Sequence, residues 1–291
     1  MQPAARLIAR PDPALPIAAL VIGQPVATAA ALLPRVFNLC RAAQLQAVTL
    51  ALGGAVTPGT GEELLRDHLL KLFVAWPERL GQGARPLPGN WKGAPEALGR
   101  TVFGPAGVPA TQADFADFLE SGQGTAPVLR AIDRAFARGE AVTPDLPLAD
   151  AANLWTGQPV ENSPAARHAG HPVLRAIERT RGRGPFWRAA ARLLDIAALV
   201  SATFPAPESP APGEALVPAT RGLYGLRLTV QGGRITAFAR VTPTDSLLAR
   251  DGVLARSLAS LDAARAGQAA LLLDILDPCS PVTLTAEAEH A

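Results

Sequence analysis

The chain of 291 residues contains two cysteines, Cys40 and Cys279, and they lie near its opposite ends. Thiolates are strong ligands for soft and borderline transition metals, and they are good nucleophiles. A buried free cysteine can also act simply as a small apolar side chain, and this alternative stays open here. The absence of a C-x-x-C pair disfavours a thiol redox enzyme. One cysteine near each end of a chain that has many other apolar residues raises the question of thiolate chemistry.

Each cysteine belongs to a short motif. Residues 35–40 read R-V-F-N-L-C, and residues 277–282 read D-P-C-S-P-V. The two motifs resemble those that hold the metals in nickel-iron hydrogenase large subunits, R-x-C-G-x-C near the N-terminus and D-P-C-x-x-C near the C-terminus. Phe37 and Asn38 replace the first cysteine and the glycine, and Val282 replaces the last cysteine. Half of the metal ligands of that family are therefore missing.

Two further motifs match the family in order and spacing. Thr220-Arg221-Gly222 stands where the large subunits have P-R-G, and Pro243-Thr244 stands where they have P-T or P-S. In that family these groups surround an iron that carries cyanide and carbon monoxide, and an arginine or a hydroxyl can donate a hydrogen bond to bound cyanide. A solvated arginine and an ordinary turn threonine are the alternatives. The residues that the resemblance implies around such a ligand are Arg35, Arg221, Pro243 and Thr244.

The resemblance also implies what the missing ligands remove. A hydrogen-cleaving site of this type uses four thiolates, two of which bridge nickel and iron, and here Cys40 and Cys279 remain. Loss of soft ligands argues against nickel and hydrogen turnover, whereas two thiolates could hold a low-spin iron with two cyanides and one carbon monoxide. Cys40 aligns with a bridging position and Cys279 with a terminal one, so either the iron is displaced or one thiol suffices with outside help. We expect a transient site for the Fe(CN)2(CO) unit without nickel.

An eroded, shortened large subunit is typical of hydrogenase accessory proteins of the HupK/HoxV kind. The resemblance implies an assembly scaffold rather than an enzyme. It would receive the Fe(CN)2(CO) unit from a small HypC-like chaperone with a HypD-like partner and pass it to the hydrogenase large subunit precursor. The alternative is a chaperone or docking protein whose cysteines are inert. Thr285 replaces the histidine that follows the last cysteine in large subunits, so we expect no C-terminal proteolytic maturation.

The composition excludes other classes of function. Hydrophobic residues make up 48% of the chain and the formal net charge is +2, so a sizeable core is possible and nothing indicates nucleic-acid binding. Two distant cysteines fit a reducing, cytoplasmic setting. The uncharged residues 13–34 imitate a signal peptide, but Pro16 and Pro25 interrupt them and cleavage after Ala29 would end just before the first motif. We expect neither secretion nor a membrane span.

The elements that must position the candidate residues are mostly helical. Residues 17–22 are predicted to be extended, Pro34 to break a helix and Pro77 to end one. Cys40 would begin a helix whose N-terminal dipole stabilises its thiolate. The periodic apolar residues predict helices over 26–33, 40–52, 62–76, 111–120, 127–138, 186–203 and 253–276, and Gly267 can break the last of them.

The clearest β signal is an alternation of apolar residues on both sides of Gly232-Gly233, which predicts a small hairpin over 223–242. The prediction is a predominantly helical α+β fold, a reduced version of the hydrogenase large subunit forming a single domain over 1–291. Irregular loops are expected at 81–110 and 204–215, and the tail at 283–291 is expected to fray. In such a fold Cys40 and Cys279 would meet near the centre.

Overall fold

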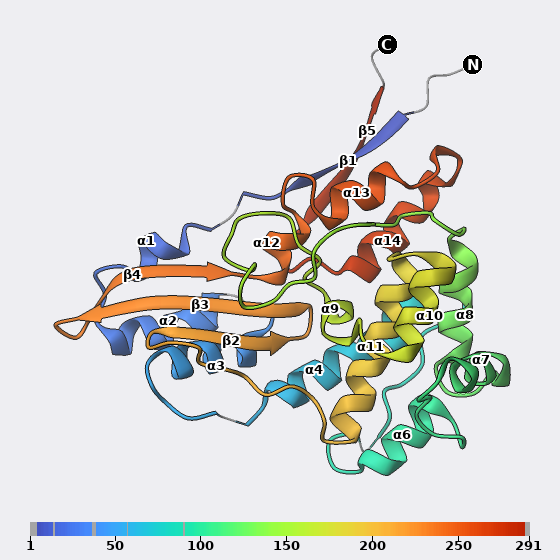
Figure 1. The fold of residues 1–291 in the computed structure, drawn as a ribbon, viewed down its shortest axis with the longest axis horizontal. Helices are drawn as coiled ribbons and strands as arrows, with labels where there is room; N and C mark the ends of the chain where they lie inside the picture. Colours follow the sequence, from blue (N-terminus) through green and yellow to red (C-terminus); the bar gives the residue numbers. More distant parts are fainter. Residues whose placement is uncertain (1–4, 14, 37–38, 57, 90, 289–291) are drawn as a thin grey trace.

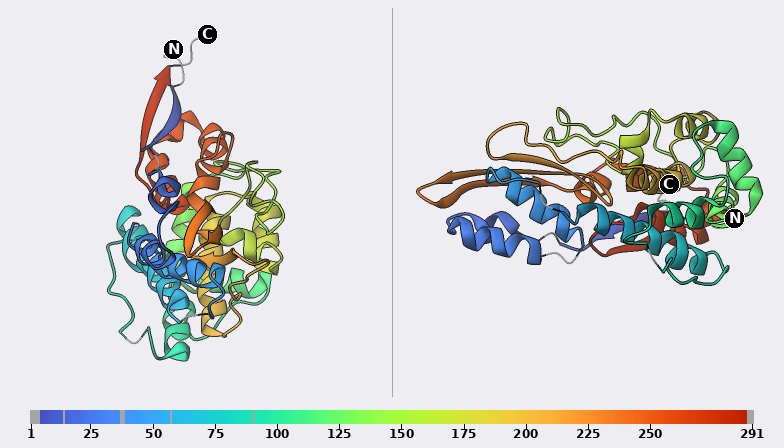
Figure 2. Two further views of the ribbon diagram at one scale, coloured as in Figure 1. Left: turned by 90° about the vertical axis from the view of Figure 1, so that its left-hand side faces the viewer. Right: turned by 90° about the horizontal axis from the view of Figure 1, so that it is seen from below.

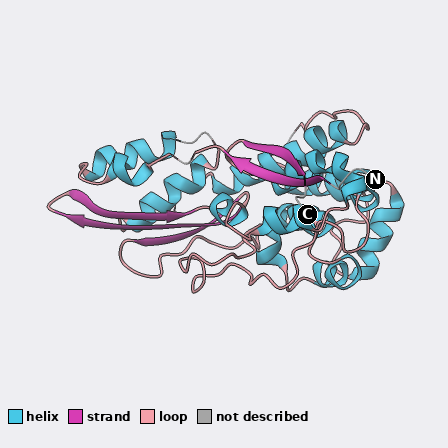
Figure 3. Ribbon diagram, turned by 90° about the horizontal axis from the view of Figure 1, so that it is seen from above, coloured by secondary structure: helices cyan, strands magenta, loops and turns pink. Residues whose placement is uncertain are grey.

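The structure is a computed structural model that describes residues 5–13, 15–36, 39–56, 58–89 and 91–288. Helices dominate, and the strands form two small antiparallel sheets, which confirms the predicted α+β class (Figure 1). The larger sheet lies at one end of the molecule and most helices gather at the other (Figure 3). None of the described helices combines the length and apolar composition needed to cross a membrane.

The three-stranded sheet has the order β2-β3-β4, with β2 at Glu214–Ala219, β3 at Gly222–Gln231 and β4 at Arg234–Val241. Strands β3 and β4 form the predicted hairpin. Strand β2 was not predicted, and its first two residues fall in the segment 204–215 that was expected to be irregular. Pro218 lies inside β2, and the strand tolerates it because β2 is at the edge of the sheet, where one side needs no backbone donor.

Helices α1 (Ile17–Val21), α2 (Val26–Val36) and α3 (Arg41–Ala51) pack against this sheet (Figure 2). We call α1–α3 and β2–β4 the sheet half. The predicted extended segment at 17–22 was wrong, because Ile17 and Val21 are buried while Ala19 between them is exposed, a helical pattern. Pro34 does not break α2. It lies buried in the last turn, where its missing donor costs one backbone hydrogen bond.

The helical half begins with one continuous run made of α4 (Thr60–Leu69), a π-helical turn (Leu70–Ala75) and α5 (Trp76–Arg79). The prediction that Pro77 ends this run was wrong, because the run continues through Arg79 beyond the π-helical turn. Segment 81–110 is not irregular throughout, since it contains α6 (Pro95–Phe103), which packs against α11.

The central helix of this half is α11 (Pro185–Val200), which contacts α4, α6, α8, α9, α10 and α14. The predicted helix at 111–120 is confirmed as α7, with a capping box between Thr111 and Asp114. The predicted helix at 253–276 is divided, with a 3-10 turn at Ala263–Gln268. The other helices are α7 (Gln112–Ser121), α8 (Ala126–Ala135), α9 (Pro164–His168), α10 (Pro172–Arg181), α12 (Pro243–Leu247), α13 (Val253–Ala259) and α14 (Ala269–Leu276).

The two ends of the described chain pair with each other. Strand β1 (Ala5–Pro11) and strand β5 (Val282–Ala288) form an antiparallel ribbon that projects from the rest of the molecule (Figure 2). The prediction of a frayed tail was wrong up to Ala288, and residues 289–291 lie outside the described part. The reason is the alternation of Val282 and Leu284 with threonines, which lets one face of β5 pack against the helical half.

The apolar interior consists of two clusters. One joins the helices of the helical half, and the other joins α1–α3 to the inner face of the three-stranded sheet. Cys40 belongs to the second cluster and Cys279 packs against it, whereas Leu276, three residues before Cys279, belongs to the first. The two cysteines therefore lie where the sheet half and the helical half meet.

Candidate functional site

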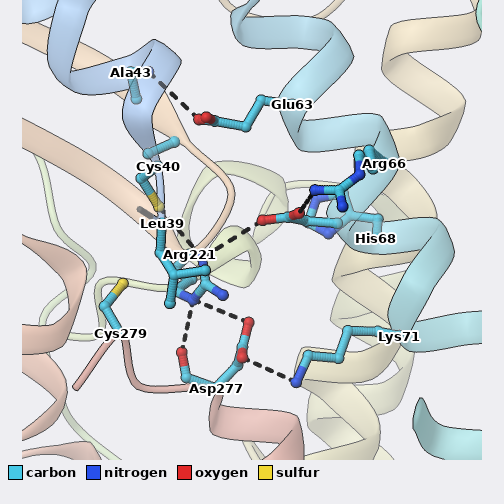
Figure 4. A network of polar contacts seen from close by, with 12 residues as sticks. Leu39, Cys40, Ala43, Glu63, Arg66, His68, Lys71, Arg221, Asp277 and Cys279 are labelled. Atoms are coloured by element: carbon cyan, nitrogen blue, oxygen red, sulfur yellow. Dashed lines mark hydrogen bonds and ion pairs between the residues drawn. The ribbon is translucent and has the colours of Figure 1, made fainter. Parts of the chain in front are cut away.

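The fold brings together the two cysteines predicted to bind metal. Cys40 is buried immediately before α3, and Cys279 is half-buried in the connection from α14 to β5. Both are free, they lie on either side of Arg221 (Figure 4), and each thiol shifts the pKa of the other. The backbone is left-handed at Cys40 itself, with a φ of 58°, and at Asp277, two residues before Cys279, with a φ of 55°. Such left-handed residues occur rarely unless their surroundings hold them.

Arg221 connects the two cysteine segments. It lies in the turn between β2 and β3, where its Nη1 donates to Cys40 Sγ at 3.3 Å and its Nε donates to the Asp277 carbonyl at 2.9 Å and to Asp277 Oδ2 at 3.0 Å (Figure 4). The following Gly222 has a φ of 145°, and a Cβ there would lie 2.3 Å from the Asn162 carbonyl oxygen. Glycine after the arginine thus lets this turn pack against the helical half.

Asp277 collects three cations around one carboxylate. Lys71 Nζ lies 2.9 Å from Oδ1, and Arg192 Nη2 and Arg221 Nε each lie 3.0 Å from Oδ2. Burial alone would raise the pKa of Asp277, but Arg192, Arg221 and Lys71 hold it below its usual value. The π-helical turn carries Lys71, and a π-turn re-aims side chains relative to a regular helix. Arg221 Nη1 also lies 3.7 Å from Asp67 Oδ2, so three cations face two carboxylates here.

The two thiols differ in acidity. The hydrogen bond with Cys279 and burial raise the pKa of Cys40 well above its ordinary value. The hydrogen bond from Cys40 lowers the pKa of Cys279 to about 6, and the charge of Arg221 and the hydroxyl of Thr244 act in the same direction. The surroundings of Cys279 thus favour its thiolate form more than the surroundings of Cys40 do.

Pro243 and Thr244 lie beside Cys279, at the start of α12. Thr242 caps this helix by a capping box with Asp245, which fixes the two residues that follow the cap. The backbone N–H of Cys279 donates to Thr244 Oγ1 at 2.9 Å. The Thr244 hydroxyl is thereby oriented with its own hydrogen available to a sulfur or another acceptor nearby.

The N-terminus of α3 does not serve Cys40 as predicted. The carboxylate of Glu63 accepts from the backbone N–H groups of Ala42 at 2.8 Å and Ala43 at 3.5 Å. A carboxylate at this position uses the free donors and the positive end of the helix dipole. The predicted stabilisation of the Cys40 thiolate by its helix is therefore wrong, and the positive group beside Cys40 is Arg221.

Arg35, also predicted near the metal, lies exposed in the last turn of α2. It makes no hydrogen bond or ion pair with the site residues that the structure describes. Phe37 and Asn38, which replace two conserved positions of the first motif, lie outside the described residues. The fold thus gathers five of the six predicted residues and leaves Arg35 at the surface.

A second buried ionic cluster lies behind the site in the helical half. Asp195, fully buried, accepts from His68 Nε2 at 2.8 Å and His168 Nε2 at 2.7 Å and pairs with Arg167 Nε at 3.3 Å. Burial opposes ionisation of Asp195, but the charge of Arg167 and the two histidine hydrogen bonds keep its pKa below its usual value. Arg192 Nη1 lies 3.3 Å from His68 Nδ1 and so links this cluster to Asp277.

The sequence analysis missed Lys71, Arg192 and Asp195. A signal for two of them was present, since Arg188, Arg192 and Asp195 recur at helical spacing on the otherwise apolar α11. In the described ranges, no group of three or more histidine, cysteine or carboxylate side chains is arranged to hold a metal ion. Any metal at the two thiols would need ligands from elsewhere.

Comparison with solved structures identifies the fold. A Ni-Fe-Se hydrogenase from Desulfovibrio vulgaris Hildenborough, as-isolated and oxidised, aligns with a TM-score of 0.54 and 13% identity, over 96% of this chain and 97% of that chain. The G491S variant of the enzyme, pressurised with oxygen gas, aligns with a TM-score of 0.52 and 14% identity over 96% of this chain and 97% of that one. The chain has the fold of the hydrogenase large subunit, as the sequence predicted.

Sequence comparison identifies the family. No family model matches the chain. The chain is 51% identical over 282 residues to the hydrogenase expression/formation protein HupK of Rhodobacter capsulatus, an alignment that covers 97% of this chain and 92% of that protein. With eroded cysteine motifs on a large-subunit fold, the chain belongs to the HupK family of hydrogenase expression/formation proteins.

Proposed function

We propose that this chain holds an Fe(CN)2(CO) unit between Cys40 and Cys279 and passes it to the precursor of a nickel-iron hydrogenase large subunit. The observation that carries the proposal is the meeting of the two thiols around Arg221, from motifs at opposite ends of the chain. The iron unit is the cargo of the protein, so the chain acts as a carrier in assembly and not as an enzyme.

The donor set fits this cargo. Two thiolates suit a soft, low-spin iron, and the three diatomic ligands would fill positions that the protein leaves unfilled. A larger protein ligand set is unnecessary because the unit brings its own ligands. Two thiols are too few for the soft coordination that nickel has in the hydrogenase, so we expect no nickel here.

The surrounding charges fit it as well. Two thiolates and two cyanides give an anionic complex, and the three cations Lys71, Arg192 and Arg221 outnumber the carboxylates of Asp277 and Asp67 that pair with them. The guanidinium of Arg221 and the hydroxyl of Thr244 can donate to a cyanide nitrogen or a sulfur with charge assistance. Pro243 presents no backbone donor there. Arg35 has no part in this proposal because it is exposed.

The different acidities of the two thiols imply an order in which they bind the iron unit. Cys279, ionised near neutral pH, would bind the incoming iron first, and Cys40 would bind once the metal displaces its proton. The donor we propose is a small HypC-like chaperone with a HypD-like partner, and the setting is the reducing cytoplasm. An acceptor with four thiolates would draw the iron away from a carrier with two.

Infrared spectroscopy and iron analysis test the proposal on protein purified anaerobically from a host that expresses hydrogenase maturation genes. Cyanide and carbonyl bands should accompany bound iron in the wild-type protein and disappear in Cys40→Ala and in Cys279→Ala. Ser280→Ala, next to Cys279 but without a ligating group, is the matched control and should keep the bands. Absent bands in wild-type protein from that host, together with intact binding of the large subunit precursor, would leave a chaperone with inert cysteines.

A further inference from the structure

Large hydrophobic side chains are exposed mainly in one part of the molecule. Eight are exposed in the described residues, and the helical half contributes Val108 alone. Five lie in or beside α1–α3 and are 41–54% exposed, namely Leu15, Leu20, Ile22, Leu39 and Leu45. Scattered exposed hydrophobics need no explanation, but a concentration on one layer indicates a surface that another molecule covers.

The layer that carries them is also poor in charge. No residue of 13–34, which includes α1 and most of α2, is charged. In Figure 2 the helices of this layer lie on the outside of the three-stranded sheet, and their inner sides fill the core of the sheet half. An uncharged, partly apolar outer side is unfavourable in water and favours association with a matching surface.

This layer adjoins the thiol site. Leu39 directly precedes Cys40, and Arg41 and Leu45 share one face of α3 because they are four residues apart. Arg35 and Arg41 flank the cysteine and are exposed. Neither forms an ion pair with a carboxylate in the part of the chain that the structure describes. Two exposed cations beside an apolar surface call for carboxylates on the molecule that covers it.

We propose that the outer face of α1–α3 is the docking surface for the protein that takes the iron unit, and that this partner presents an apolar patch edged by carboxylates for Arg35 and Arg41. The inference rests on the proposed function. A thiol of the acceptor must approach to about 2.3 Å from the metal, so the docking surface must border Cys40, as this face does. The occupant is the large subunit precursor, which alone among the proposed partners needs four thiolates around its metals.

The experiment measures binding of the purified large subunit precursor to the full-length protein by biolayer interferometry at two salt concentrations. Leu45→Glu should weaken binding at least about tenfold, since it places a charge in an apolar contact. Arg41→Glu should weaken binding most at low salt, because a rim charge acts through screened attraction. Val108→Glu makes the same kind of change on the helical half and should bind as the wild type does.

The outcomes separate this inference from the proposed function. Infrared bands of the iron unit should persist in Leu45→Glu and Arg41→Glu, because both side chains are exposed and neither hydrogen-bonds to a thiol among the described residues. Bands absent even from the wild type would contradict the carrier function and leave the binding result standing. Binding of the precursor unchanged in both variants would overturn the docking surface. A loss that Leu45→Glu causes only in self-association or only in binding of the small HypC-like chaperone would overturn the choice of occupant.

Discussion

The two halves of the molecule place charged and apolar side chains in opposite ways. The helical half buries ionic groups in three clusters, centred on Glu161, Asp195 and Asp277, and hides nearly all of its large hydrophobics. Among the described residues, the sheet half buries one charged side chain, Arg221, and exposes most of the large hydrophobics that are accessible.

The difference separates two tasks. Buried ion pairs hold the helices in one arrangement, since breaking such a pair leaves an uncompensated charge. The sheet half supplies Cys40 and Arg221 and has a surface suited to contact. The site forms where the two halves meet. The helical half contributes Lys71 and Arg192 to it, and the sheet half contributes the proposed docking surface beside it.

The largest effect should come from the ionic framework of the helical half. Asp195→Ala leaves Arg167 buried without its carboxylate and removes the acceptor of His68, so we expect the free energy of unfolding to fall by about 3–5 kcal/mol. Urea unfolding measures it. Glu96→Ala, at an exposed ion pair with Arg100, is the control and should change it by no more than about 0.5 kcal/mol.

The same variant shows whether the Asp195 cluster influences the thiols. Asp195 touches neither cysteine, so the titration of Cys279 should stay near pH 6 in the folded Asp195→Ala protein. A loss of stability below about 1 kcal/mol would mean that the cluster is not a structural framework.

The next effect concerns the thiols. Cys40→Ala removes the hydrogen bond that lowers the pKa of Cys279, so we expect that pKa to rise from about 6 to about 8 or above, near the ordinary value of a thiol. The rate of Cys279 alkylation by iodoacetamide, followed from pH 5 to pH 10, measures it, because the thiolate is the reactive form.

The surroundings of Cys279 stabilise its negatively charged thiolate, so they lower its pKa. A lowered pKa means that the thiolate persists as pH falls to about 6 in the wild type, whereas in Cys40→Ala the rate should already fall through pH 8. Ser280→Ala should titrate as the wild type does. An unchanged midpoint in Cys40→Ala would show that Arg221 and Thr244 alone set the acidity of Cys279.

The smallest effect tests how the C-terminal ribbon is attached to the helical half. Leu284 in β5 is half-buried against the helical core, so Leu284→Ala should cost about 1 kcal/mol, less than a fully buried leucine. It should also speed amide exchange in β5. Thr283→Ala, on the exposed side of the same strand, should change stability little, and equal effects of the two would contradict the packing of this ribbon.

Much of the arrangement could be predicted from local patterns. Apolar periodicity located most helices, and alternation around two glycines located the β3–β4 hairpin. Motif order predicted that Cys40, Arg221, Thr244 and Cys279 would converge. The predictions for residues 17–22, for part of 81–110 and for the C-terminal tail were wrong. The tail that forms β5 is mostly polar, and its short alternation of Val282 and Leu284 with threonines does not reveal the pairing with β1 at the other end of the chain.

By itself, the sequence determined the chemical types at the site: two thiols, the glycine after Arg221 and the eroded motifs that mark the family. The tertiary structure decided which charges surround them. Lys71 and Arg192 come from α4–α5 and α11, and Glu63 takes the helix N-terminus that the sequence had assigned to Cys40. The physical reason is that electrostatic effects depend on distances in space, whereas sequence spacing fixes distances only within one helix or hairpin.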